Sequence, residues 1–175
     1  MANYKSIAVV GQAIVKILKD SSRNEFPDAK FKLIQAADLV TNKRHPREGA
    51  SVCLYHVDLN SEWRNAPPIH DPIDRPVHPP IPLKLSFLIT PWSMDAERQT
   101  RLLGWTLRTL QNTPIMSAAF LNGVVSNEVV FSSDEAVKLI YAPQSLSELS
   151  IVFQNLKHPN VLSSVTYIAS LVIGE

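Results

Sequence analysis

Seven of the thirteen prolines in this chain fall within residues 66–82, between two strongly apolar segments. Proline fixes φ and lacks a backbone N–H group, so this stretch is predicted to form neither a helix nor an interior strand. We expect an extended, partly polyproline-like arm, kept in water by Asp71, Asp74 and Arg75. Long irregular segments of compact domains are usually functional or disordered. Two alternatives stay open, namely a disordered surface loop and an arm that orders against a neighbouring subunit.

The segments on either side of the arm have the pattern of β-strands. Residues 50–58 alternate Cys53, Tyr55 and Val57 on one face with Val52, Leu54 and His56 on the other. Both faces are mostly apolar, which predicts a strand covered on both sides. Residues 83–90 alternate Leu83, Leu85, Phe87 and Ile89 with Lys84, Ser86 and Leu88. The dipeptide Thr90-Pro91 is predicted to end this second strand.

Apolar residues at helical spacing predict two long helices. The first covers residues 4–20. The second covers residues 94–111, with Ser93 as its N-cap. Its predicted core stripe consists of Leu103, Leu107 and Leu110. Glycine inside a helix costs roughly 1 kcal/mol relative to alanine, so we expect Gly104 to mark a close approach of this helix to the sheet or to another helix.

The remaining elements are short. A strand is predicted at 31–35, a helical segment at 114–121 before the turn Asn122-Gly123, strands at 129–131 and 137–141, and a long final strand at 164–173. Ser145 and Glu148 form the capping box of a late helix. Helices interspersed with a small antiparallel or mixed sheet predict an α+β fold in a single domain, residues 1–175, with the arm at 66–82.

Composition describes an ordinary globular chain, with 45% hydrophobic and 19% charged residues and a net charge of +1. This charge balance gives no electrostatic reason to expect nucleic-acid binding. The short basic cluster at 43–47 is interpreted as a solvated loop. No stretch is long and apolar enough to predict a membrane span, and the first residues lack a signal-peptide layout. We therefore expect cytoplasmic synthesis and assembly.

Motifs for catalysis and cofactor binding are missing from the sequence. The five glycines are scattered singly, which excludes the glycine-rich phosphate loops. His70, Asp71, Asp74 and His78 could supply metal ligands, but their spacing fits no known site. The lone Cys53 lies in mid-strand, where a thiolate would lack stabilisation, and His56 is expected to be half-buried. We predict no cofactor, no metal and no enzymatic activity.

Several polar and aromatic residues are assigned to packing or subunit contacts instead. Trp63, Trp92 and Trp105 lack the surrounding basic residues that nucleotide stacking would need. Arg64 and Asn65 follow the first strand and precede two prolines. An arginine there can bind loop carbonyls or a neighbour's carboxylate at a chain reversal.

The order of these segments carries more information than any one of them. The first strand contains Leu54-Tyr55 and is followed by Asn60 and the pair Arg64-Asn65. After the proline-rich loop comes a strand whose pattern is given by Pro82, Leu83, Leu85, Phe87, Leu88, Thr90 and Pro91, and then a helix with Leu103-Gly104. In this order the chain resembles the tail-terminator (cap) proteins of contractile injection systems, of the antifeeding-prophage type. The opening helix, the run 146–149 and the final strand also fit, and Phe153 takes the place of a frequent tryptophan.

The resemblance implies a structural protein that forms a homo-hexameric ring at the distal end of a phage-tail-like particle. Such a ring ends polymerisation of the tube and the sheath and joins the two, so the expected partners are other copies of the chain, the tube protein and the sheath protein. Closed cyclic symmetry satisfies lateral contacts without propagating them. The particle is assembled in the bacterial cytoplasm and can be released from the cell. The candidate interface residues are Trp63, Arg64, Asn65, Pro67, Pro68, Arg75, Pro82, Trp92 and Trp105.

Two other functions are kept as alternatives. One is a connector or minor tail protein of a phage. The other, from a different class, is a small enzyme that uses Cys53 or the histidines of the 70–78 loop.

Overall fold

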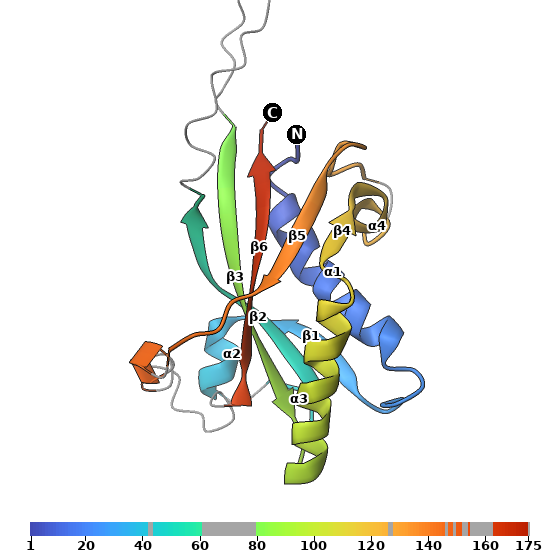
Figure 1. Cartoon of the computed structure of the whole chain (residues 1–175), viewed down its shortest axis with the longest axis vertical. Coiled ribbons are helices and arrows are strands. Elements are labelled where there is room, and N and C mark those ends of the chain that lie inside the picture. Colours follow the sequence, from blue (N-terminus) through green and yellow to red (C-terminus); the bar gives the residue numbers. More distant parts are fainter. Residues whose placement is uncertain are drawn as a thin grey trace, which may run out of the picture.

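The structure of the chain is a computed structural model, in which residues 1–41, 44–60, 80–125, 128–145, 147–148, 150–151, 154 and 163–174 are described (Figure 1). The helices are α1 (Ser6–Ser21), α2 (Ala36–Thr41), α3 (Ala96–Gln111) and α4 (Ala118–Asn122). The strands are β1 (Lys30–Ile34), β2 (Gly49–Leu59), β3 (Ile81–Trp92), β4 (Ile115–Ser117), β5 (Ala136–Tyr141) and β6 (Val165–Ile173).

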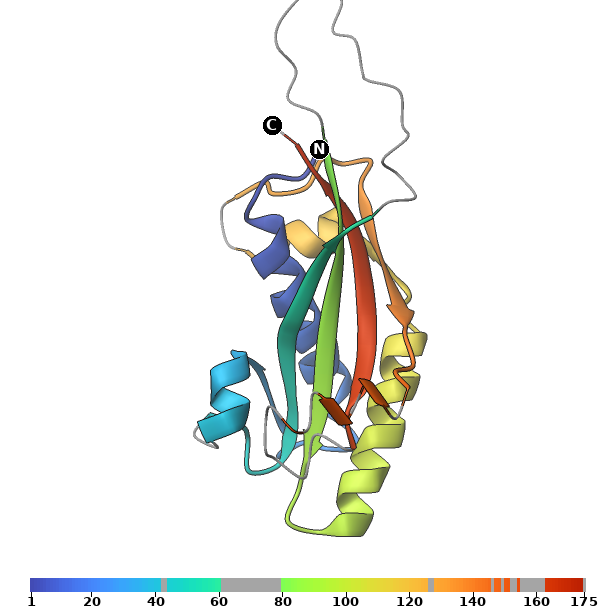
Figure 2. The same ribbon diagram turned by 90° about the vertical axis from the view of Figure 1, so that its left-hand side faces the viewer.

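The described strands form one six-stranded sheet in the order β1-β2-β3-β6-β5-β4. β1 runs parallel to β2, and the other neighbouring pairs are antiparallel. The predicted α+β fold with a small mixed sheet is therefore confirmed. Figure 2 shows α2 beside the lower part of β2, apart from α1 and α3.

Strand β3 separates two hydrophobic cores. Its odd-numbered residues, Leu83 to Ile89, pack in a large core with α1, α3 and α4. Its even-numbered residues Leu88 and Trp92 belong to a smaller core on the opposite face. Ile34, Leu39 and Cys53 complete this second core. Because successive side chains of a strand point to opposite faces, a strand that is apolar on both faces needs a cover on each side.

The same double cover applies to the first half of β2, up to Cys53, and is lost beyond it, where residues 56–59 are exposed. A register shift between Leu54 and His56 also changes the predicted faces. The extra residue, Tyr55, puts Val57 opposite Leu85 and on the same face as Leu54. The prediction that Val57 shares a face with Cys53 is wrong, because a β-bulge reverses the alternation beyond it.

Two prolines lie inside β3, although each was predicted to lie outside the strand. Pro82 was assigned to the arm, and Thr90-Pro91 to the end of the strand, yet β3 runs from Ile81 to Trp92. The Pro82 carbonyl accepts a hydrogen bond from the Asn60 N–H group, just past the last pair of β2 with β3. Since N–H and C=O of one residue point to the same side, the missing donor of Pro82 points beyond that last pair. Successive residues of a strand point to its two neighbours in turn, so the missing donor of Pro91 points towards β6. The pairing of β3 with β6 ends at Ile89, so neither proline removes a hydrogen bond between paired strands.

Helix α3 begins two residues later than predicted, and its cap is Asp95 instead of Ser93. The Asp95 carboxylate accepts the Arg98 N–H group at 2.8 Å, as an N-cap side chain does. The buried stripe consists of Leu102, Thr106 and Leu110. Leu103 and Leu107 are half-buried at its margin, so two of the three residues of the predicted stripe are wrong by one position.

Residues 129–131 form a loop, not the predicted strand, because one side chain binds their backbone. The Asn122 amide oxygen accepts the N–H groups of Val130 and Phe131, each at 2.9 Å. Its amide nitrogen donates to the Phe131 carbonyl at 2.8 Å. The predicted helical segment 114–121 is correct only in its second half, since β4 precedes α4.

Other predicted elements are confirmed with small shifts of their ends, namely α1, β1, β5 and β6. The capping box is also present, because the Ser145 N–H group donates to Glu148 Oε2 at 2.8 Å and the Glu148 N–H group donates to Ser145 Oγ at 3.3 Å. Leu146, Leu149 and Phe153 lie outside the described residues. The assignment of residues 1–175 to one domain stays a prediction.

The expectation for Gly104 is wrong, and this difference yields a stability test. Gly104 is exposed, and a Cβ atom built there meets nothing within 4 Å. Gly104→Ala should therefore raise the free energy of unfolding by roughly 0.5–1 kcal/mol, as expected for an exposed helix position. Urea unfolding of the purified chain measures the change.

Gly49 supplies the opposite control. Its φ is +132°, and a Cβ atom there would lie 1.9 Å from the Lys30 carbonyl oxygen. Gly49→Ala should destabilise the chain by more than about 1–3 kcal/mol, because alanine can neither adopt that φ without strain nor fit the space. A destabilised Gly104→Ala variant, or an unaffected Gly49→Ala variant, would contradict this account.

Candidate functional site

The predicted interface residues fall into two groups. Trp63, Arg64, Asn65, Pro67, Pro68 and Arg75 lie outside the described residues. Their interface role stays a prediction. Pro82, Trp92 and Trp105 are described, and the structure places them in three different surroundings.

Trp92 lies in the smaller core, with 2% of its surface exposed. Its indole Nε1–H donates to Ser51 Oγ at 2.8 Å on the neighbouring strand. The His45 ring stacks on the indole, with ring centroids 4.0 Å apart and planes 14° apart. The buried indole with its satisfied N–H group serves the interior of this chain, and it leaves almost no surface for a partner.

Trp105 joins α3 to the region between α1 and β1. It is half-buried, at an edge-to-face distance of 5.5 Å from Phe26, and its ring centroid is 5.8 Å from that of Phe31. Such aromatic pairs contribute roughly 0.5–1.5 kcal/mol beyond their burial. Trp105 therefore fixes the position of α3 against the start of the sheet.

The residues of the family-like pattern are mainly structural. Leu83, Leu88, Thr90 and Asn60 are all buried. Thr90 Oγ1 lies 2.7 Å from Ser164 Oγ, where it links β3 to the start of β6. The Tyr55 hydroxyl accepts a hydrogen bond from Gln144 Nε2 and so connects the bulge of β2 to the segment after β5.

Cys53 has the surroundings of an inert thiol. It is buried, and burial raises its pKa to about 11, with a smaller contribution from the charge of Asp38. A protonated thiol is a poor nucleophile. His56 is exposed, contrary to the half-buried position expected for it. His70 and His78 lie outside the described residues.

The described residues contain neither a metal-ligand cluster nor a membrane-spanning helix. No group of three His, Cys, Asp or Glu side chains in them could hold a metal ion. None of the helices in this part of the chain is long and apolar enough to cross a membrane.

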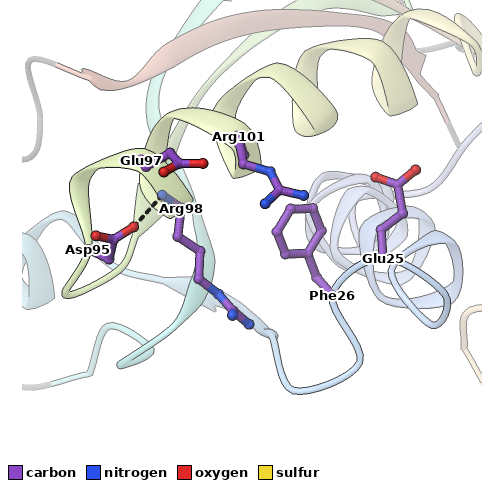
Figure 3. A pocket seen from close by; sticks show the side chains of 6 residues that line it. All are labelled: Glu25, Phe26, Asp95, Glu97, Arg98 and Arg101. Carbon is purple, nitrogen blue, oxygen red and sulfur yellow. Dashed lines mark hydrogen bonds between the residues drawn. The ribbon is translucent and has the colours of Figure 1, made fainter.

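The described part of the chain has hollows on its surface, two of which differ clearly in their linings. The first has a volume of about 290 Å³ and lies at the start of α3 (Figure 3). Its lining is strongly charged and consists of Glu25, Phe26, Asp95, Glu97, Arg98 and Arg101. Figure 3 shows the Arg101 guanidinium beside the Phe26 ring. Arg98 also forms an ion pair with Glu48, just before β2, so the charge of one of the two arginines that line the hollow is already paired outside it.

The second hollow, about 600 Å³ in volume, is more apolar and lies between α1, the end of β1 and β2. Tyr4, Ile7 and Gly11 line it from the helix side, and Leu33 and Leu54 line it from the sheet. Sequence reasoning missed this hollow, because it depends on β1 ending midway along β2. Neither hollow brings together a nucleophile, a base and an orienting group, as acyl or phosphoryl transfer would require.

The comparison with protein families decides the affiliation. The model of the Pvc16 N-terminal domain matches residues 9–175. This chain belongs to the Pvc16 N-terminal domain family. No curated protein matches the chain.

Two solved structures share the fold of this Pvc16 N-terminal domain. One is the sheath/tube terminator of an extracellular contractile injection system, PVC, in the extended state. It has a TM-score of 0.61 and 17% sequence identity, and the match covers 97% of this chain and 56% of that one. The other is the tube-terminating cap of the anti-feeding prophage. It has a TM-score of 0.54 and 16% identity, and the match covers 95% of this chain and 54% of that one. The chain thus spans about half the length of the structures that it matches.

The buried thiol of this Pvc16 N-terminal domain gives a direct chemical test. With a pKa of about 11, Cys53 stays protonated well above neutral pH. A thiol reagent at pH 8 should label the folded chain at least about a hundredfold more slowly than the urea-unfolded chain, because the shift of two pKa units lowers the thiolate fraction to that extent. Mass spectrometry measures both rates.

The same pKa shift predicts the direction of a pH effect. The folded state binds the thiol proton more tightly than the unfolded state, whose thiol has its ordinary pKa of 9.0. The resulting stabilisation is complete below pH 9 and is lost as the pH rises towards 11. Rapid labelling of the folded chain at pH 8 would contradict the buried, protonated thiol.

Proposed function

We propose that this chain forms the cap of a contractile injection system, as a hexameric ring at the distal end that ends tube and sheath polymerisation and joins the two layers. The observation that carries the proposal is the match of residues 9–175 to the Pvc16 N-terminal domain. Two terminator caps with the same fold over almost the whole of this chain support it. The tube protein, the sheath protein and other copies of the chain are its proposed partners.

The physical requirements of a cap agree with the kind of structure described here. One surface of a terminator must bind the growing end of the polymer. Its opposite surface must not bind a further layer of subunits. Lateral contacts that close into a ring fulfil this, because closure uses them up. A stable scaffold is also needed, and the two cores on either side of β3 supply it.

A non-enzymatic role is part of this proposal. The only cysteine is buried, with a pKa raised to about 11, so the alternative of a cysteine-dependent enzyme has no activated nucleophile. We further propose that the chain is made and assembled in the cytoplasm and leaves the cell as part of the particle. The sheath/tube terminator with the same fold comes from an extracellular system.

The purified chain tests the ring directly. Size-exclusion chromatography should give a species of about six chains, and negative-stain images should show rings with a central opening. A chain that stays monomeric at high concentration, both alone and together with tube protein, would contradict the proposed ring.

The proline-rich arm is proposed to take part in contacts between subunits or with the sheath. Its prolines reduce the entropy lost on ordering, because the unbound chain is already stiff. Replacement of residues 67–80 by a Gly-Ser linker of equal length should leave the fold intact and abolish ring formation or capping. The replacement ends before Ile81, where β3 begins. Circular dichroism checks the fold, and electron microscopy checks the rings and capped particles.

A second variant separates stiffness from side-chain contacts. In it, the prolines at 67, 68, 72, 76, 79 and 80 become serine while the remaining arm residues stay. Intermediate loss of capping is expected, because the contacts of the other arm residues remain while the pre-ordering by proline is removed. Full-length capped particles with the Gly-Ser arm would show that the arm is dispensable.

A further inference from the structure

The edge strand β1 covers only half of its neighbour. β1 pairs with β2 from Lys30 opposite Gly49 to Ile34 opposite Cys53. The chain then turns away from β2 into α2. At this turn the Gln35 N–H group donates a hydrogen bond to the Asp38 carboxylate at 3.0 Å. β2 continues to Leu59, paired with β3 on its inner side only. Among the described residues, no strand lies on the outer side of residues 54–59, which form the left edge of the sheet in Figure 1.

Backbone groups of this half-strand point outward without a strand partner. The Asn60 N–H group donates inward to the Pro82 carbonyl at 2.8 Å. Since successive residues of a strand alternate between its two edges, the N–H groups of Leu59 and Val57 point outward. The Leu59 N–H group is accepted by the Asp58 carboxylate at 2.7 Å, in place of a neighbouring strand. For the Val57 N–H group, the described part of the chain offers no neighbouring strand.

On the helix-side face of the sheet, this edge carries exposed apolar side chains. Val57 is 43% and Leu59 is 51% exposed, and both lie on the helix-side face of the sheet, opposite Leu85 and Leu83. Next to them lies the apolar hollow between α1, β1 and β2. Tyr4 and Leu33 on its rim are 74% and 42% exposed. Exposed apolar edges are templates for pairing, and natural proteins protect them with lysine, proline or a covering loop. Residues 54–59 contain neither lysine nor proline.

We propose that the outer edge of residues 54–59 of β2 is a docking site for an extended segment of another protein, which adds to the sheet as a strand in line with β1. About six residues match the length of the free edge, at roughly 3.3 Å per residue. Backbone hydrogen bonds supply the affinity, and alternate side chains supply the specificity. Every second residue of the segment is apolar and lies over Leu54, Val57 and the hollow.

The opposite face of the added strand has a different chemistry. There it lies beside His56 and Asp58, which are exposed and face away from α1. A lysine or arginine next to Asp58 would form a cross-strand pair of opposite charges. The expected ligand therefore alternates apolar residues with polar or basic ones.

A second copy of this chain is the less suitable occupant. Pairing of two copies through the same edge would give a closed two-fold contact, which conflicts with a six-fold ring. Pairing of β2 in one copy with the opposite sheet edge, β4, in the next would be short, because β4 is only three residues long. This argument against self-pairing rests on the proposed ring, whereas the docking edge itself does not.

A short peptide and the purified full chain test the proposal. The probe is an acetylated and amidated peptide of six alternating valine and threonine residues followed by one lysine. Saturable binding should shift the amide signals of Val57 and Leu59 in nuclear magnetic resonance spectra. Hydrogen exchange of the Val57 amide should slow at least about tenfold, because the amide gains an acceptor. The same peptide with alternate amides N-methylated, on the edge that would face β2, should bind at least about tenfold more weakly.

Val57 offers a matched pair of variants. Val57→Pro removes the outward donor and should therefore bind the peptide at least about tenfold more weakly. The fold should tolerate it, because proline is accepted where the N–H group points away from the ladder. Val57→Thr keeps the donor and the side-chain shape and should bind within about twofold of the wild type. If Val57→Pro fails to fold, the N-methylated peptide still tests the edge.

Three results would overturn the proposal. They are the absence of saturable binding at millimolar peptide, equal binding of the N-methylated peptide, and protection of Val57 that rises with protein concentration without any peptide. The last result would identify a second copy as the occupant. None of these results depends on whether the chain caps particles, so failure of the docking edge and failure of the cap are distinguishable.

Discussion

The two-sided burial of β3 is the constraint on which the rest of the structure depends. β3 has a strand on each edge, β2 and β6, and a hydrophobic core on each face. Burial of one large apolar side chain contributes roughly 1.5–3 kcal/mol, and Leu85, Phe87, Leu88 and Ile89 are all almost completely buried. A strand without polar faces can be stable only if both covers are present. The helix layer covers one face of this strand, and the α2 region covers the other.

Local features of the chain follow from this arrangement. Trp92 and Ser51 form a buried hydrogen bond between β3 and β2 inside the smaller core, where an unpaired indole N–H group would be costly. Pro82 and Pro91 are accommodated because the missing donor of each points past the end of a neighbouring strand. The bulge at Tyr55 turns Val57 and Leu59 to the helix side, beyond the point where β1 ends. A well-packed centre thus carries an uncovered half-edge, where we propose that another strand docks.

The sequence predicted the fold class and the positions of the main elements, because periodicity and capping residues are local signals. Reciprocal binding of Ser145 and Glu148 is such a case. Features that depend on tertiary contacts were predicted incorrectly. Gly104 was assigned to close packing, yet the direction of a helical residue depends on which face meets the core, and Gly104 faces open space. Residues 129–131 have strand-like composition, but Asn122, the last residue of α4, binds their backbone groups.

For the candidate site, sequence reasoning was limited in the same way. Trp92 was among the candidate interface residues, whereas its position in β3 places it in the smaller core. The family-like order of short segments predicted the right family, because order along the chain is independent of where each side chain points. The half-covered edge of β2 was not predicted, since nothing in residues 30–34 indicates how far their pairing partner extends.

The central claim is that this chain ends the growth of a tube and a sheath. The most direct measurement is the length distribution of particles assembled from tube and sheath proteins with and without the chain, by electron microscopy. The account predicts particles of uniform length with density for the chain at the distal end, and a broad distribution of longer, uncapped polymers when the chain is omitted. An unchanged length distribution without the chain, or density for it elsewhere on the particle, would contradict the account.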